Sequence, residues 1–195
     1  PQRSLASVAS PPAGTGTTYD ALGRAILRLQ DSELGLLQTT TTYNSGFTRT
    51  VTNPRGQATT TWFQAFDQPS EDLALRIDAP ENLRVVFVRD AFGKATSITR
   101  SDVRGGAYPS ATRSYVYDSN HLLCKTIEPE IGATMESYDA ASNVAWRATG
   151  LGLTSLACDR DSVPAAKRIA YSYDTRNRLL GTTYGDGSPG ITRSY

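Results

Sequence analysis

The sequence predicts an all-β protein in which tandem β-hairpins stack into an extended, curved antiparallel sheet. Three observations indicate this fold. An aromatic residue followed by an acidic or amide residue recurs along the chain, a second turn signal falls between the recurrences, and Thr, Ser, Gly and Tyr are abundant. Aromatic and β-branched residues favour strands, whereas Gly, Ser and Asp favour turns.

The first signal is the dipeptide Tyr-Asp together with degenerate forms such as Tyr43-Asn44 and Phe66-Asp67. Two of the steps between recurrences are long, and they contain insertions near residues 101–110 and 149–167. We therefore predict about seven repeat units over residues 19–195, after a connecting segment at residues 1–18. The acidic or amide residues are Asp20, Asn44, Asp67, Asp90, Asp118, Asp139 and Asp174.

Each unit is expected to contain two turns and two short strands. The Asp side chain can accept a backbone N–H two residues on, and residues that tolerate positive φ follow it at Gly23, Gly93 and Asn177. A strand such as Ala95–Thr99 comes next, and a turn rich in Pro or Gly then returns the chain. These return turns are expected at 52–56, 78–82, 128–132 and 184–187.

The Tyr before each Asp ends a strand, so its ring is expected to stack on the equivalent ring of the next repeat and form an aromatic ladder. Residues 19–38 also permit a helical interpretation, because Leu22, Ile26 and Leu29 partly fit a helix period. The glycines at Gly23 and Gly35 and the phase of the repeat favour strands there.

Charge is balanced, with 20 Lys and Arg against 19 Asp and Glu. A net charge of +1, with the basic residues scattered, argues against a nucleic-acid partner or an anionic membrane surface. The longest apolar run, Val85–Val88, is far too short to span a bilayer. The chain starts at Pro1 and ends on a stretch that resembles an interrupted strand, so we expect a fragment of a longer polypeptide truncated at its C-terminus.

The segments 19–24 (Tyr-Asp-Ala-Leu-Gly-Arg) and 173–180 (Tyr-Asp-Thr-Arg-Asn-Arg-Leu-Leu) resemble the RHS, or YD, repeat, and 123–130 with 138–144 are similar to the repeats of large proteobacterial RHS proteins. The resemblance implies a β-ribbon that winds into a hollow shell, as in polymorphic toxins, insecticidal toxin complexes and teneurins. It also implies a bacterial protein that is secreted or at the cell surface, with neighbouring repeats of the same polypeptide as partners. Self-cleaving members carry a core segment with an acidic active site, and no match to it occurs here.

Cys124 and Cys158 are the only cysteines, and the second lies inside the later insertion. We predict a disulfide that attaches this insertion to the repeats; the alternative is two buried free thiols. His121 precedes Cys124 by three residues, which permits a Cys–His nucleophile pair, but His121 occupies the turn position taken elsewhere by Gly or Asn. A turn residue is therefore the favoured interpretation of His121.

Other chemistry has weaker support. Trp62 and Trp146 are candidates for a carbohydrate-binding surface, although aromatic residues in strands more often pack across strands. The acidic runs at 159–161 and 185–187 lack the ligand spacing of a helix-loop-helix calcium site. We predict no catalytic residue, no metal and no cofactor.

The sequence therefore predicts a structural RHS-repeat scaffold, the wall of a secreted shell or fibre that encloses or presents a toxin or other cargo. The alternative is a cell-surface module that binds carbohydrate or protein. An enzyme is the least favoured class, because no acid–base or metal set can be assembled. Exposed sheet edges are also expected to permit self-association of the chain.

Overall fold

In a computed structural model, which describes residues 14–65, 70–104 and 110–195, these residues form fifteen strands and two short 3-10 helices. The strands form one open antiparallel sheet in which neighbours follow chain order from β1 to β15. The all-β prediction is confirmed. The helical interpretation of residues 19–38 is wrong, because this stretch forms β2 (Ala25–Ser32) and the start of β3 (Gly35–Asn44).

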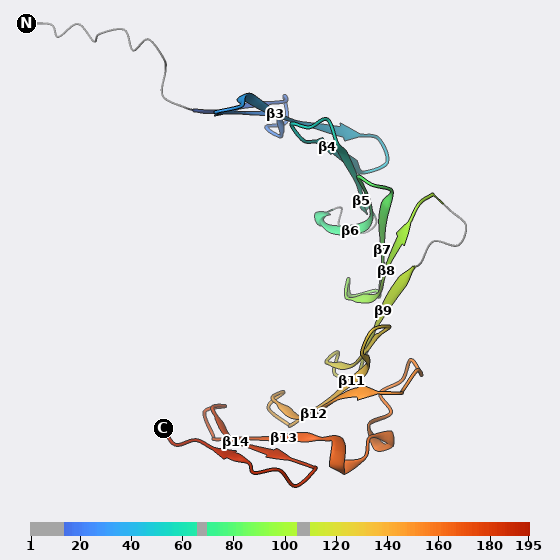
Figure 1. Ribbon diagram of the computed structural model, residues 1–195, viewed down its shortest axis with the longest axis vertical. Coiled ribbons are helices and arrows are strands. Elements are labelled where there is room, and N and C mark those ends of the chain that lie inside the picture. The colour runs from blue at the N-terminus through green and yellow to red at the C-terminus, as the bar shows by residue number, and fades with distance from the viewer. Residues whose placement is uncertain (1–13, 66–69, 105–109) are drawn as a thin grey trace, which may run out of the picture. The chain divides into compact units, whose positions relative to one another are not determined.

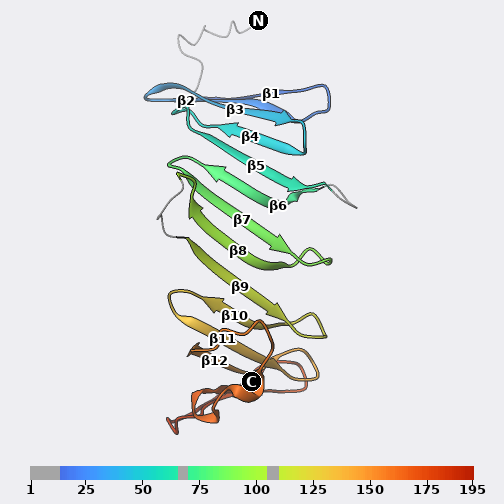
Figure 2. The same cartoon turned by 90° about the vertical axis from the view of Figure 1, so that its right-hand side faces the viewer.

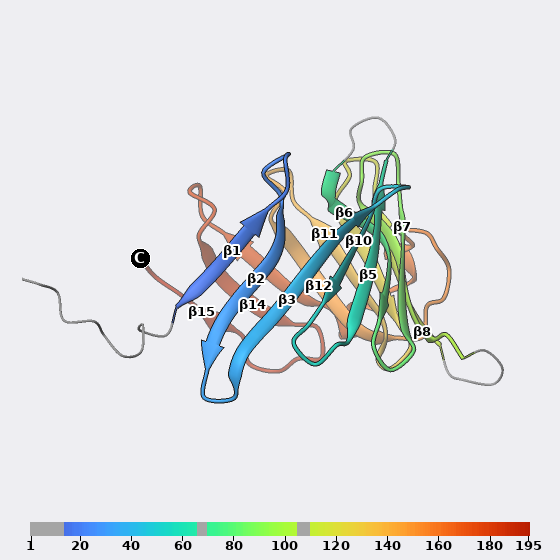
Figure 3. The ribbon, with the colours of Figure 1, turned by 90° about the horizontal axis from the view of Figure 1, so that it is seen from above.

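The chain divides into two compact units, Pro1–Val85 with Asp102–Arg104, and Val86–Ser101 with Gly105–Tyr195. In the first unit each strand pairs antiparallel with the next, and Figures 2 and 3 show the blue and cyan strands side by side in chain order. The register shifts once in the first pairing, between Thr18 and Tyr19, and twice in the last, on either side of Phe63. Residues 15–18, which the sequence analysis placed in a connecting segment, belong to the first strand. The strands are β1 (Thr15–Tyr19), β2 (Ala25–Ser32), β3 (Gly35–Asn44), β4 (Thr48–Thr52), β5 (Ala58–Gln64) and β6 (Ser70–Ala79).

The boundary between the units falls within β7 (Leu83–Arg89). The second unit continues the meander, and the 3-10 helices η1 (Arg160–Ser162) and η2 (Ala165–Lys167) lie between β12 and β13, in the orange segment of Figure 1. Its strands are β8 (Ala95–Asp102), β9 (Ala111–Tyr117), β10 (Leu123–Glu128), β11 (Gly132–Tyr138), β12 (Val144–Leu151), β13 (Ile169–Tyr173), β14 (Leu179–Tyr184) and β15 (Ile191–Thr192).

In a meander, successive turns alternate between the two ends of the strands. In the second unit, one end has the turns that start at Asp90, Asp118, Asp139 and Asp174. The other end has the connections β10–β11, β12–β13 and β14–β15. In this unit the chain therefore shows the arrangement of two turns per repeat that the sequence predicts.

Little of the sheet is covered. Among the described residues, Phe63 is the one buried hydrophobic side chain of the first unit. The second unit has a compact apolar cluster, which includes Met135, Ala148 and Val163, and a segment that follows β12 covers it. Burial of a side chain the size of Met contributes roughly 1.5–3 kcal/mol, so this cluster is a major apolar contribution to the stability of the second unit.

Candidate functional site

Within the described residues, six turns share one hydrogen-bond pattern, and we call them Asp-type turns. The Oδ1 atom of the first turn residue accepts the backbone N–H groups of the second and fourth residues after it, at 2.8–3.0 Å. Its own N–H donates to the carbonyl of the fourth residue after it. One side chain thus satisfies the backbone groups of a tight reversal. The first residues are Asp20, Asn53, Asp90, Asp118, Asp139 and Asp174.

The third residue after the start of each Asp-type turn has left-handed backbone, with φ between 59° and 78°. The predicted turn residues Gly23, Gly93 and Asn177 take this place, as do His121 and Ser142. Glycine adopts this conformation without steric cost, whereas residues with a Cβ atom adopt it less readily. His121 therefore lies at a backbone-determined turn position, as the favoured interpretation of the sequence had it.

A turn follows Asn44 directly, at residues 45–47, but it is not an Asp-type turn, so the acceptor role expected of the Asn44 side chain is wrong. Asn44 ends β3, and its side-chain amide donates to Thr50 Oγ1 at 3.2 Å. Gly46 and Phe47, with φ of 73° and 56°, reverse the chain instead. Two consecutive left-handed residues make a tight hairpin without a side-chain acceptor. The predicted turn residue Asp67 lies outside the described residues.

Asn53 starts an Asp-type turn that the sequence analysis treated as a simple return turn. Its Oδ1 accepts the N–H groups of Arg55 and Gln57, both at 3.0 Å, and Gly56 has a φ of 76°. The signal was present, because Asn53 and Gly56 have the same spacing as Asp20 and Gly23.

Asn53→Ala is expected to lower the free energy of unfolding of the first unit by about 1 kcal/mol, because two turn N–H groups lose their acceptor. Asn44→Ala, the matched control, is expected to cost less than about 0.5 kcal/mol. Urea unfolding followed by Trp62 fluorescence in a Trp146→Phe background measures both. Equal losses in the two variants would contradict the assignment of the turn.

Tyrosine hydroxyls connect successive repeats through the backbone. Each donates to the carbonyl of the fifth residue after the preceding Asp that starts a turn. The pairs are Tyr43 to Ala25 (3.4 Å), Tyr117 to Ala95 (3.0 Å), Tyr138 to Leu123 (2.8 Å), Tyr173 to Val144 (3.1 Å) and Tyr195 to Leu179 (3.1 Å).

The predicted aromatic ladder is wrong. Among the described residues the ring pairs are Phe47–Phe63 and Phe92–His121, and neither joins two tyrosines. Equivalent tyrosines lie two strands apart, roughly 9–10 Å at the usual strand spacing, which exceeds the usual range for paired rings. A basic side chain lies between successive tyrosines instead. It belongs to the fourth residue after the Asp that starts the turn, and it stacks on the next tyrosine. The pairs are Arg24 on Tyr43, Lys94 on Tyr117 and Arg178 on Tyr195.

Tyr138→Phe is expected to destabilise the second unit by about 1 kcal/mol, because the Leu123 carbonyl and the Glu136 carboxylate lose the one hydroxyl hydrogen that they share. Burial, and then the hydrogen bond to Glu136, raise the pKa of Tyr138 to about 12. The stability that the neutral phenol contributes is present below the ordinary tyrosine pKa, near 10, and is lost as the pH rises towards 12. Unfolding measured between pH 8 and 12 should therefore show a smaller alkaline loss in Tyr138→Phe; equal slopes would contradict the prediction.

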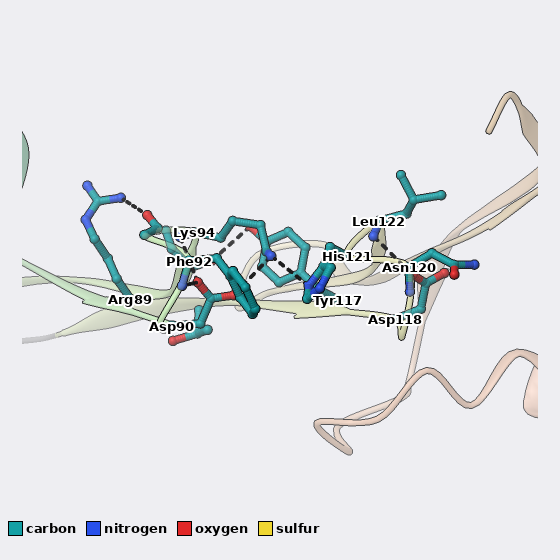
Figure 4. Close-up of polar contacts among 12 residues, drawn as sticks. Arg89, Asp90, Phe92, Lys94, Tyr117, Asp118, Asn120, His121 and Leu122 are labelled. Carbon is teal, nitrogen blue, oxygen red and sulfur yellow. Dashed lines mark hydrogen bonds and ion pairs between the residues drawn. The ribbon is translucent and has the colours of Figure 1, made fainter.

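The Asp90 and Asp118 turns lie at the same end of the strands of the second unit, and their side chains contact each other, as Figure 4 shows. Lys94 Nζ lies 3.3 Å from the Asp90 carboxylate and 3.2 Å from His121 Nδ1. An ammonium group only donates, so His121 Nδ1 accepts. The His121 ring also packs edge-on against Phe92, with centroids 4.4 Å apart. These side chains link adjacent turns of the repeat.

Cys124 and Cys158 form a disulfide, with their Cα atoms 5.6 Å apart. Cys124 lies at the irregularity in β10 that follows the Asp118 turn, where the register with β9 shifts between Leu123 and Lys125. A bulge residue is left out of the strand pairing and is re-aimed. Because both sulfurs are in the disulfide, no thiol is available for the Cys–His pair considered from the sequence.

Residues 152–168 form a strap over β10–β12. Lys125, whose side chain is completely buried, donates to the Ser155 carbonyl at 2.9 Å and forms an ion pair with Asp159. The hydrogen bond that Lys125 donates to the Asp159 carboxylate, followed by one from the Ser155 hydroxyl, lowers the pKa of Asp159. The acidic run at 159–161 thus serves in part as an ion-pair partner, and no group of three potential metal ligands occurs among the described residues.

The strap also supplies a cation to a turn that lacks one. Arg24, Lys94 and Arg178 each pair with the Asp that starts their own turn, but the Asp118 turn has Leu122 at this position. Arg160 of the strap donates to Asp118 Oδ2 at 2.8 Å instead, and this contact lowers the pKa of Asp118.

Arg160→Met is expected to cost the second unit about 1 kcal/mol, because Asp118 loses its charged donor. Leu122→Arg in the same chain should restore the part of this loss that comes from Asp118, since it recreates the local pair of the other turns. The hydrogen bond that Arg160 donates to the Glu136 carbonyl is not restored. Leu122→Arg alone is the control, and it should change stability little. Urea unfolding followed by Trp146 fluorescence in a Trp62→Phe background measures the three variants. Absence of rescue would contradict the claim that Arg160 takes the place of the local cation of the Asp118 turn.

The two tryptophans are half-buried beneath arginines. The guanidinium carbon of Arg76 lies 4.3 Å from the Trp62 ring centroid, and that of Arg168 lies 4.4 Å from the Trp146 centroid. Each arginine covers one face of its ring, so a sugar would have only the other face for stacking. No helix within the described ranges is long and apolar enough to cross a membrane.

No protein-family model matches the sequence, and no curated protein matches it. Solved structures do match: a crystal structure of TcdB2-TccC3-TEV has a TM-score of 0.59 at 13% identity, over 87% of this chain and 9% of that chain. The fold is similar to part of the TcdB2-TccC3 complexes. TcdB2-TccC3 without its hypervariable C-terminal region gives a TM-score of 0.53 at 15% identity, with 87% and 10% of the two chains covered. This chain thus spans about a tenth of the TcdB2-TccC3 chains, and at these identities the likeness concerns the fold.

Proposed function

We propose that this chain is a section of the wall of a secreted bacterial RHS-type shell, which encloses or presents a toxin or other cargo. The observation that carries the proposal is the repeated contact between a tyrosine hydroxyl and the preceding repeat. Because each hairpin is bonded to the next in the same way, a single layer of sheet can be extended by adding repeats. The role is passive, and we propose no enzymatic activity.

The thinness of the sheet supports a wall. Ten residues are buried among those described, and most strand residues are half-buried or exposed. A globular domain buries one face of its sheet against a second layer. The similarity of the fold to the TcdB2-TccC3 complexes over 87% of this chain also supports the proposal.

Cysteine accessibility tests the proposal. Thr112 and Arg113 are adjacent, exposed residues of β9, and adjacent strand residues point to opposite faces. Each is replaced by Cys in the full-length natural protein, which is treated with a small maleimide or with a large polyethylene-glycol maleimide. A wall predicts that one position reacts with both reagents and the other with the small reagent alone.

The isolated chain is the control, because both positions should react there with both reagents. Equal reaction with the large reagent at both positions of the full-length protein would overturn the shell wall. That result would favour the alternative of an exposed adhesion module.

A further inference from the structure

The strap is held to the second unit mainly by side chains. Its 17 residues, 152–168, join two neighbouring strands, whereas residues 129–131 suffice to join β10 and β11. The backbone hydrogen bonds of its two 3-10 turns run within the strap, for example from Ser162 N–H to the Asp159 carbonyl. A long connection without strand pairing loses much conformational entropy when it is ordered, so its closed position needs strong attachments.

The attachments differ in strength. Val163 is 2% exposed within the apolar cluster, and the disulfide is the one covalent tie. The Lys125–Asp159 pair contributes less than its geometry suggests, because both charges lose hydration when the strap closes. If the strap opened, water would hydrate both groups again. The disulfide is thus the attachment whose loss most favours opening.

The disulfide can be reached from one side. Cys124 is fully buried, whereas Cys158 is half-buried. A small thiolate would attack Cys158 Sγ, the sulfur–sulfur bond would break, and Cys124 would leave as a thiolate that takes up a proton. A second thiol would resolve the mixed disulfide and release the Cys158 thiol. Two small thiols are thereby oxidised to a disulfide, and the protein disulfide becomes two thiols.

We propose that the strap is a thiol-sensitive cover: reduction of the Cys124–Cys158 disulfide by a small thiol or dithiol releases it from β10–β12 and exposes Lys125, while the strands stay paired. The cover would operate on transfer from an oxidising to a reducing compartment. This inference goes beyond the proposed wall and does not depend on it.

The chain contains three lysines, which makes the test direct: Lys94, Lys125 and Lys167. The folded chain is treated with an amine-acylating reagent before and after reduction by dithiothreitol, and labelling is measured by peptide mass spectrometry. Lys167 is exposed and Lys125 is fully buried, so Lys167 is the internal reference. Reduction is expected to raise the acylation rate of Lys125 about tenfold or more relative to that of Lys167, because local opening of the strap exposes the Lys125 amine to the reagent.

Two variants separate the disulfide from the ion pair. The variant Cys124→Ala with Cys158→Ala should show fast Lys125 labelling without reductant. Oxidised Asp159→Asn should label Lys125 more slowly than the reduced parent, because the covalent tie still limits how far the strap opens. Unchanged Lys125 labelling after both thiols have been alkylated would overturn the cover. Two free thiols in the unreduced protein would overturn it, as would loss of amide-hydrogen protection throughout β9–β14 on reduction.

Discussion

Replacing Cys124 and Cys158 with alanine is expected to lower the free energy of unfolding of the second unit by about 3 kcal/mol. The disulfide joins residues 34 positions apart and restricts the unfolded chain over β10, β11 and β12. Chain-entropy arithmetic gives about 3.8 kcal/mol for this loop. The measured loss should be smaller, because the freed strap also gains entropy in the folded state.

Single and double cysteine variants provide the control. Cys124→Ala, Cys158→Ala and the double variant remove the same bond, so their losses should agree within about 0.5 kcal/mol and should not add. Urea unfolding followed by Trp146 fluorescence, in a Trp62→Phe background without reductant, measures all three. A double variant as stable as the parent would show that the disulfide does not contribute to the fold in solution.

The turns could be predicted from the sequence because their chemistry is local. An Asp-type turn needs an acceptor side chain and a residue that tolerates positive φ three positions later, as at Asp20 and Gly23 or Asp174 and Asn177. The acceptor role expected of Asn44 is wrong because it followed from the spacing of the repeats alone. The local rule does not hold there, since Gly46 stands only two residues later. The same rule, applied without the phase, identifies Asn53 and Gly56.

Contacts between repeats could not be predicted in the same way. The predicted tyrosine ladder assumed that equivalent rings are neighbours, but an intervening strand separates them, and the hydroxyls reach a backbone carbonyl instead. The pairing of Arg160 with Asp118 joins residues 42 positions apart. The one sequence signal for it is a gap, because Leu122 stands where three other turns have Arg or Lys.

The strap has one feature that could be predicted from the sequence and one that could not. With two cysteines in the chain, one intramolecular pairing is available, and the structure contains it. The burial of Lys125 beside Cys124 could not be inferred, because a lysine side chain is almost never fully buried. The irregular register of β10 and the cover provided by the strap place Lys125 in the interior, and this arrangement has a thermodynamic consequence.

Asp159→Ala is expected to lower the free energy of unfolding of the second unit by about 2–3 kcal/mol, because it leaves the buried Lys125 ammonium without a counter-ion. The expected loss is smaller than the roughly 3–5 kcal/mol typical of a fully buried pair, since the Asp159 side chain is 25% exposed. The pKa of Asp159 is lowered in the folded state, so its contribution is present above the ordinary Asp pKa and is lost as the pH falls. Urea unfolding at pH 7 and below pH 4 measures this difference.

Lys125→Met is the matched variant, and it should cost less than about 1 kcal/mol, because methionine fills the apolar space beside Met135 and the partly exposed Asp159 can be hydrated. Adding Asp159→Ala to Lys125→Met should change stability little. A larger loss of stability in Asp159→Ala than in Lys125→Met would therefore show that the cost comes from an unpaired buried charge, not from the lost contact itself. If Lys125→Met were as damaging as Asp159→Ala, the pair itself would be stabilising, and the ion pair would hold the strap as firmly as the disulfide.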